Sequence, residues 1–156
     1  MCLITEQLTP FTAERDITVY KVLHVVPVLN VSGKGDKGLT LEAPFQKNFE
    51  YEMGGTYEVG ELEFAQTQYR RDFVHEYRRV VTHGLHSYCD QAAAIHLMYC
   101  LLALALCGEQ YCVIECTVPK GTEYYSGLSS HEICSRKLRL ERLVKLETAK
   151  SLSPMA

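Results

Sequence analysis

The chain has 156 residues, of which 47% are hydrophobic and 22% charged, and its formal net charge is −3. These values are ordinary for a globular protein with one continuous core. They argue against the strongly basic surface that is typical of a nucleic-acid-binding domain. We therefore expect one domain over residues 1–156, with a core at about 17–146 and a loose tail at 147–156.

The cysteines and the N-terminal segment indicate the compartment. The sequence contains seven cysteines, an odd number, and "MCLITEQLTP" has neither the basic start nor the apolar run of a signal peptide. A reduced, cytoplasmic protein is the simplest interpretation. The apolar segment at 92–107 is shorter than the roughly 20 residues that a membrane-spanning helix needs, so we expect no membrane association.

The first half of the chain predicts strands, a loop, a hairpin and a helix. "DITVYKVLHVVPVLNV" (16–31) is rich in Val and Ile and predicts a strand, followed by a loop at 32–38. Alternating apolar residues at 49–59 flank two glycines and predict a β-hairpin. Aromatic residues at every fourth position in 68–81 predict a helix.

The second half predicts one long apolar helix. Ser87 and Asp90 have the spacing of a capping box, so we expect the helix to run from Tyr88 to Leu106, with Gly108 as its C-terminal cap. It is apolar nearly all round and should be covered on most sides.

The segments after this helix complete the predicted fold. They predict a strand at 110–119, a loop at 121–130, a final strand at 131–140 and a short helix at 141–150. The predicted class is therefore α+β, with mixed or antiparallel strands packed around the long central helix.

The stretch "HGLHSYCDQ" (83–91) contains residue types that catalytic and metal sites use. A zinc site needs four converging ligands, but the chain has no C-x-x-C pair. Cys112 and Cys116 are four residues apart on a predicted strand, which separates their Cα atoms by about 13 Å. We predict no metal site. A structural interpretation remains open, in which Ser87 and Asp90 cap the helix and His86 bonds to the backbone.

The order of four segments resembles that of the ADP-ribosyltransferases. The segments are "VYKVL", "GLHSYCDQ", "VPKGTEYY" and "SSHEI". The resemblance implies an ADP-ribosyltransferase-like arrangement that binds NAD in a cleft, with a late glutamate that stabilises positive charge on the ribose. It implies a tyrosine at 88, 124 or 125 stacked on the nicotinamide ring. The implied catalytic residues are Glu132, Ser87 and Tyr88, and the implied NAD-binding residues are Tyr20 or Lys21, His86, Tyr124 and Tyr125.

A second resemblance covers about residues 17–140. "FEYEMGGTYEV", "GLHSYCD", "VIECTVPKGTEYY" and "HEICSRKLRL" are similar to segments of a group of small uncharacterised bacterial and phage proteins with a G-F-H-[SA]-[CY] motif. This resemblance implies a small binding or accessory domain from a phage or mobile element, with a small-molecule or protein ligand. It supplies no mechanism. The sequence thus leaves two functions open, a binding or accessory domain and an NAD-binding enzyme or its degenerate relative.

Overall fold

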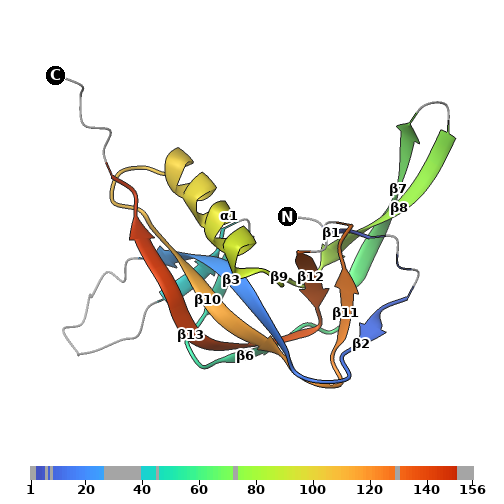
Figure 1. Cartoon of the computed structure of the whole chain (residues 1–156), viewed down its shortest axis with the longest axis horizontal. Helices are drawn as coiled ribbons and strands as arrows, with labels where there is room; N and C mark the ends of the chain where they lie inside the picture. The colour runs from blue at the N-terminus through green and yellow to red at the C-terminus, as the bar shows by residue number, and fades with distance from the viewer. Residues whose placement is uncertain are drawn as a thin grey trace.

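The computed structural model is built mainly from antiparallel β-sheet (Figure 1). It describes residues 3–5, 7, 9–26, 40–44, 46–71, 74–128 and 131–150. Of residues 4, 46–48, 63–71, 74–80, 82 and 83 it describes only the backbone. Its strands are β1 (Leu3–Thr5), β2 (Phe11–Thr12), β3 (Ile17–Val26), β4 (Thr40–Ala43), β5 (Gln46–Tyr51), β6 (Thr56–Glu58), β7 (Glu63–Arg71), β8 (Val74–His83), β9 (Leu85–Tyr88), β10 (Gln110–Val118), β11 (Glu123–Ser126), β12 (Glu132–Ser135) and β13 (Lys137–Thr148). One helix, α1, spans Gln91–Leu104.

The strands form two sheets. The larger has ten strands in the order β2-β11-β12-β9-β3-β10-β13-β6, with β4 also paired to β3 and β5 paired to β4. The smaller has the order β1-β8-β7. Strand β3 pairs with β10 from Ile17 to Val25. Its other edge divides, because β9 pairs with it at Tyr20 and β4 pairs with it from His24 to Val26.

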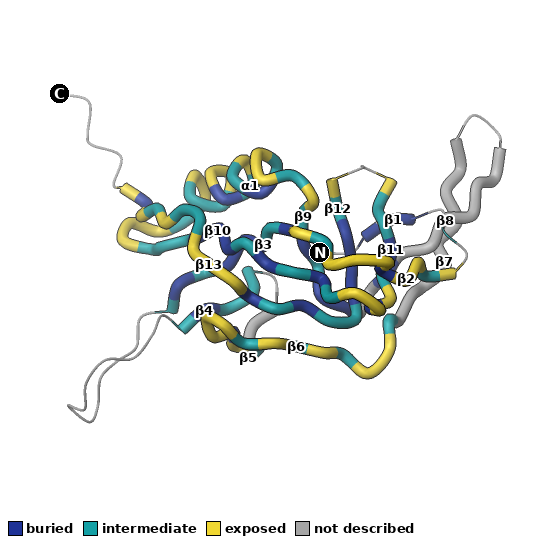
Figure 2. The backbone as a smooth tube through the Cα atoms, turned by 60° about the horizontal axis from the view of Figure 1, so that its bottom comes forward, coloured by how far each residue is buried: buried dark blue, intermediate teal, exposed yellow. Residues whose placement is uncertain are grey.

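Two apolar layers cover the two faces of the central strands, and the buried residues follow β3, β10 and β12 (Figure 2). On one face, Leu23 of β3 and Ile114 of β10 belong to a buried cluster with Leu41 and Tyr51 from β4 and β5. On the other face lies α1, which buries Ala94 and Met98. Side chains alternate along a strand, so β3 contributes to both layers.

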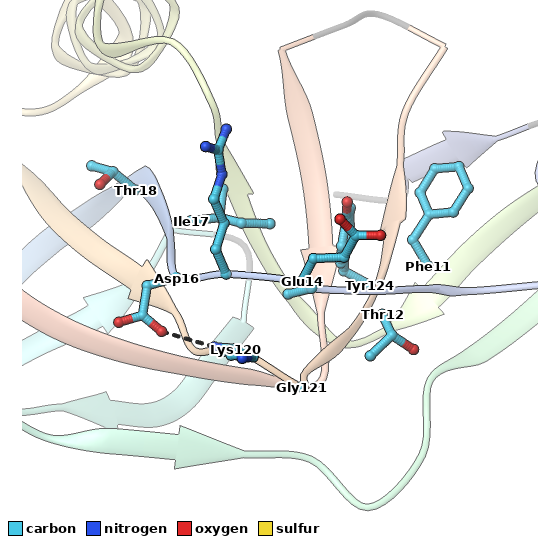
Figure 3. Close-up of a pocket in the computed structure, with 11 residues that line it drawn as sticks. Phe11, Thr12, Glu14, Asp16, Ile17, Thr18, Lys120, Gly121 and Tyr124 are labelled. Atoms are coloured by element: carbon cyan, nitrogen blue, oxygen red, sulfur yellow. Dashed lines mark hydrogen bonds between the residues drawn. The ribbon is translucent and has the colours of Figure 1, made fainter.

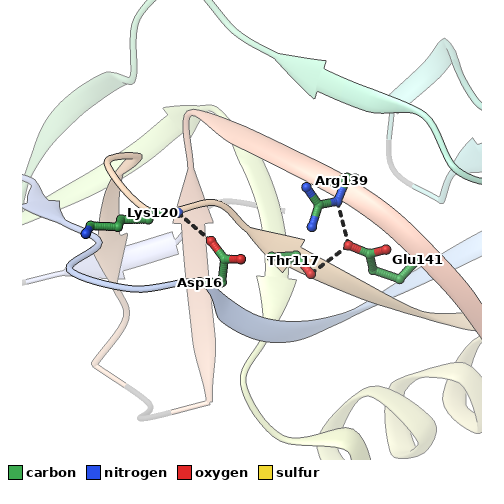
Figure 4. A network of polar contacts seen from close by, with 5 residues as sticks. All are labelled: Asp16, Thr117, Lys120, Arg139 and Glu141. Carbon is green, nitrogen blue, oxygen red and sulfur yellow. Dashed lines mark hydrogen bonds and ion pairs between the residues drawn. The ribbon is translucent and has the colours of Figure 1, made fainter.

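Polar contacts join the ends of the central strands. The backbone N–H of Lys120 donates to Asp16 Oδ1 at 2.8 Å, which ties the turn after β10 to the start of β3 (Figure 4). Glu141 Oε1 accepts from Arg139 Nε at 2.6 Å and from Thr117 Oγ1 at 2.9 Å. These two hydrogen bonds lower the pKa of the Glu141 carboxyl. All of these groups are close to solvent, so they contribute to register more than to stability.

The predicted α+β class is wrong, since strands dominate the described residues and the helix lies on one face of a sheet. The helix predicted at 68–81 corresponds to β7 and β8. A spacing of four residues puts side chains on one side of a helix and equally on one side of a strand. Asp72 and Phe73, at the centre of that prediction, lie outside the described residues.

Other sequence predictions are partly corrected. The strand predicted at 16–31 is confirmed from Ile17 to Val26, and residues 27–31 lie outside the described residues. The strand predicted at 110–119 is confirmed as Gln110–Val118. The strand predicted at 131–140 is two strands, β12 and β13. The helix predicted at 141–150 is wrong, because β13 extends to Thr148. The segment predicted as a loop at 121–130 contains the strand β11. The loop predicted at 32–38 and the end of the tail, 151–156, lie outside the described residues.

The turn and cap predictions also change. Gly54 adopts a positive φ of 78° in the predicted turn, but β5 and β6 then pair with different strands, β4 and β13. Asp90 alone is the helix N-cap, and its side chain accepts from Ala92 N at 3.0 Å. Ser87 lies in β9, and the helix ends at Leu104, before Gly108. No helix among the described residues is long and apolar enough to cross a membrane.

Gly84, which lies between β8 and β9 in the chain, provides a test of the packing against Cys134 and Leu62. We expect Gly84→Ala to lower the free energy of unfolding by about 1–3 kcal/mol, the usual cost of overpacking a core. The added Cβ would overlap Cys134 Sγ and would lie 2.7 Å from Leu62 Cδ2. Urea unfolding followed by circular dichroism measures the change. Gly60→Ala is the control, because nothing lies within 4 Å of a Cβ added there. Equal effects of the two substitutions would contradict the expectation.

Candidate functional site

Three of the predicted site residues lie in one row across three neighbouring strands. Tyr88 of β9 is paired with Tyr20 of β3 on one side and with Glu132 of β12 on the other. Directly opposed residues in antiparallel strands project from the same face, with Cβ atoms about 4.5–5.5 Å apart. All three side chains are half-buried. Residues separated by 112 positions in the chain thus meet at one surface.

The row continues across two further strands. Glu115 of β10 is the register partner of Tyr20, and Arg142 of β13 is the register partner of Glu115. Arg142 Nε also forms an ion pair with Glu115 Oε2. The row therefore crosses five strands, about 19 Å at the usual strand spacing. It has an arginine ion-paired with a glutamate at one end, two tyrosines in the middle and a second carboxylate at the other end.

Helix α1 follows β9 directly (Figure 1) and packs against the two tyrosines. Tyr20 and Tyr88 pack against the cluster that includes Ala94 and Met98, so the helix covers part of each ring. The helix starts three residues after Tyr88, with Asp90 as its cap. Its first N–H groups carry partial positive charge, which the Asp90 carboxylate offsets by accepting from Ala92 N.

The electrostatics of Tyr88 define what it can do. Burial, with a smaller contribution from the charge of Glu132, raises the pKa of Tyr88 to about 12. Its hydroxyl is therefore protonated at neutral pH and can donate a hydrogen bond. A phenol donor next to a carboxylate can bind a sugar hydroxyl and stabilise positive charge on the adjoining carbon.

The structure separates Ser87 from this row. Side chains alternate along β9, so Ser87 projects from the face opposite to Tyr88. The Ser87 side chain is buried, and its hydroxyl has no hydrogen-bond partner among the described residues. His86 is paired with Cys134 in β12, and His86 Nε2 lies 3.7 Å from Cys134 Sγ. The adjacent triplet His86-Ser87-Tyr88 therefore does not act as one cluster.

Of the two residues of β3 predicted to bind NAD, Tyr20 belongs to the row and Lys21 is buried in the core. Lys21 Nζ donates to the backbone carbonyl of His86 at 2.6 Å and lies 5.3 Å from the centre of the Tyr51 ring. Its side chain is buried. Burial lowers the pKa of Lys21 to about 8. Lys21 is thus a buried contact between β3 and β9.

The two tyrosines of β11 also lie in different environments. Tyr125 is buried in a cluster with Leu3, Val81 and Cys134. Tyr124 lines an open groove of about 1230 Å³, where its ring packs edge-on against Phe11 with centroids 5.7 Å apart (Figure 3). The groove also includes Thr18, two residues before Tyr20 in β3. A ligand can therefore contact Tyr124 in the groove, but not as part of the row of Tyr20, Tyr88 and Glu132.

The chain matches no protein-family model, no curated protein and no solved structure. Any function assigned to it must therefore rest on the geometry of its own residues.

Three residues of these surfaces were not predicted from the sequence: Glu115, Arg142 and Phe11. Glu115 carried a usable signal, because it is the one charged residue in the apolar run "QYCVIECTV" of β10. Its position opposite Tyr20 depends on the register between β3 and β10, which the sequence does not state. Phe11 gave no signal, since single exposed aromatic residues are common.

The buried ammonium of Lys21 predicts a pH effect on stability. Its pKa of about 8 lies below the value of about 10.4 of an exposed lysine. Between these values the unfolded chain holds a proton that the folded chain has lost, so stability gains from Lys21 as pH rises. Below pH 8 both states hold the proton and the effect is constant.

We expect the free energy of unfolding of the wild type, relative to Lys21→Met, to increase by about 2–3 kcal/mol from pH 7.5 to 10.5. The comparison is needed because burial also raises the pKa of the Cys112 and Cys116 thiols to about 12, and this lowers stability at high pH in both proteins. Urea titrations at each pH measure the difference. Parallel pH curves would show that Lys21 titrates normally in the folded protein.

Proposed function

We propose that the Tyr20–Tyr88–Glu132 row binds NAD and that the protein acts as an ADP-ribosyltransferase-type enzyme. The observation that carries this proposal is the register that opposes Tyr20 to Tyr88 and Tyr88 to Glu132. These are three of the positions that the resemblance to ADP-ribosyltransferases implies. Their alignment from three distant segments supports a common role.

The chemistry assigns a task to each side chain. Breaking the bond between nicotinamide and ribose generates positive charge on the ribose, which the Glu132 carboxylate stabilises. The half-buried ring of Tyr20 or Tyr88 offers a surface on which nicotinamide stacks. The Tyr88 hydroxyl, protonated because its pKa is about 12, donates to a ribose oxygen. Arg142, exposed at the far end of the row, is ion-paired with Glu115, so a phosphate binds its guanidinium only by replacing that carboxylate.

The test combines NAD binding with nicotinamide release. We expect the wild type to bind NAD by calorimetry and to release nicotinamide in a chromatographic assay. Glu132→Gln should keep most of the NAD affinity but lower the rate of release by about 100-fold or more, as when a group that stabilises the transition state is removed. Glutamine keeps the shape of the side chain and removes its charge.

Ser87→Ala is the matched control, since Ser87 lies one residue from Tyr88 on the opposite face of β9. We expect it to leave both measurements unchanged. Absence of NAD binding and of nicotinamide release in the wild type would reject the proposal. Equal loss in Ser87→Ala and Glu132→Gln would show that damage to β9 or β12, and not the charge of Glu132, causes the effect.

The groove beside Phe11 and Tyr124 favours a second candidate, a binding or accessory domain without chemistry. This groove offers an aromatic pair and the cations Arg15 and Lys120, and its lining excludes Tyr88 and Glu132. Amide chemical shifts distinguish the two candidates. NAD that shifts residues around Tyr20 and Tyr88 supports the enzyme, and NAD that shifts only residues 11–18 and 120–124 supports the binding domain.

A further inference from the structure

The outer face of α1 is apolar and uncharged. The helix "QAAAIHLMYCLLAL" contains no Asp, Glu, Lys or Arg. It buries Ala94 and Met98 against the sheet, and on the opposite side it exposes Ala92, His96, Cys100 and Ala103. A helix that is apolar on all sides is normally covered on all sides. In the described part of the chain, this outer face has no cover.

His96 and Cys100 have the geometry of two metal ligands. They are one helical turn apart, and His96 Nε2 lies 3.7 Å from Cys100 Sγ. In a tetrahedral zinc site, bonds of about 2.0–2.1 Å to nitrogen and about 2.3 Å to sulfur put these two atoms about 3.6 Å apart. The observed distance equals one edge of such a site to within about 0.1 Å. Both side chains are exposed, so zinc can reach them from solvent.

Within the described residues, the His96–Cys100 pair supplies only half of the ligands that a structural zinc site needs. The described residues contain no group of three or more His, Cys, Asp or Glu side chains that could hold a metal ion. Structural zinc sites have four protein ligands. The missing pair is not among the described residues, and a second copy of the same helix supplies it in the same geometry.

The surroundings of the pair suit a second copy of α1. Ala92 and Ala103 flank the pair along the exposed face, so two helices can approach to the usual axial separation of about 8–10 Å. Because the helix carries no charged residue, like charges do not repel across a two-fold axis. We propose that His96 and Cys100 form half of a zinc site, which the same two residues of a second copy complete, and that zinc thereby joins two chains through α1.

The binding step releases protons. Each Cys100 thiol loses its proton to solvent as it becomes a thiolate ligand, and each His96 binds through its neutral ring. Two thiolates balance the two positive charges of one zinc ion. The site is thus neutral, as required at an apolar helix–helix contact.

The pair His86 and Cys134 has the same separation of 3.7 Å, but in a different setting. Cys134 is buried between strands, where a second chain cannot approach it. The proposal therefore concerns only the exposed pair on α1, and substitutions there separate the two pairs.

The experiment titrates the metal-free, reduced full chain with Co²⁺ and then with Zn²⁺, with a phosphine reductant present to prevent disulfides. We expect one metal ion for every two chains, with the intense visible absorption of tetrahedral cobalt and a thiolate-to-cobalt charge-transfer band. Light scattering after size exclusion should show a monomer without metal and a dimer with Zn²⁺. Excess chelator should return the dimer to monomer.

Variants of exposed residues test the assignment without disturbing the core. Cys100→Ser and His96→Gln should each abolish the dimer and the tetrahedral cobalt spectrum, with helical circular dichroism unchanged. Cys107→Ser is the control for an exposed thiol outside the pair and should behave as the wild type. One metal per monomer, a dimer that forms without metal, metal binding unchanged in Cys100→Ser, or no metal binding at all would each overturn the proposal.

Discussion

The divided edge of β3 is the constraint on which the rest of the structure depends. One edge of this strand pairs with β10 from Ile17 to Val25, whereas the other is shared by β9 at Tyr20 and β4 near its end. Lys21 sits at the division and donates to the carbonyl of His86 on β9 at 2.6 Å. Burying an ammonium group is unfavourable, but an unpaired carbonyl at the same place would add a further penalty. The lysine thus adds a second contact between β3 and β9 beside their register pair at Tyr20 and Tyr88. The edge of β3 can then be shared by β9 and β4.

The division also positions the candidate site. Because Tyr20 and Tyr88 are the one backbone register pair between β3 and β9 among the described residues, this pair fixes which residues of the two strands lie side by side. Strand β12 then places Glu132 on the far side of Tyr88, and α1 begins just after β9. The same backbone pairing that solves a topological problem therefore aligns the tyrosines and the carboxylate beneath the start of a helix. The two opposite faces of β9 differ in burial, since Tyr88 is half-buried on one face and Ser87 is buried on the other.

The sequence predicted correctly those strands and helices whose composition and spacing fit only one type of secondary structure. The Val- and Ile-rich β3 and β10 were predictable, as was the apolar segment of α1. The segment around Tyr69 was not, because four-residue spacing fits a helix and a strand equally. The predicted hairpin failed for a different reason, since Gly54 makes the turn but non-local pairing sends β5 and β6 to different strands. For the site, the sequence supplied Tyr20, Tyr88 and Glu132 as candidates. It could not exclude Lys21 or Ser87, because exclusion depends on which face each side chain takes, and strand register decides that.

The two proposed sites lie on opposite sides of one helix, and this arrangement links their stability. The inner side of α1 buries only Ala94 and Met98 completely, yet it supports the rings of Tyr20 and Tyr88. The outer side, with His96 and Cys100, is exposed to solvent. Contact with a second copy would cover that outer side and add apolar burial that the monomer lacks, so the helix would be held more firmly against the sheet. The tyrosines would then rest on a more rigid support. A metal-linked dimer thus provides a physical reason for an apolar, uncharged helix on the surface and a firmer base for the site beneath it.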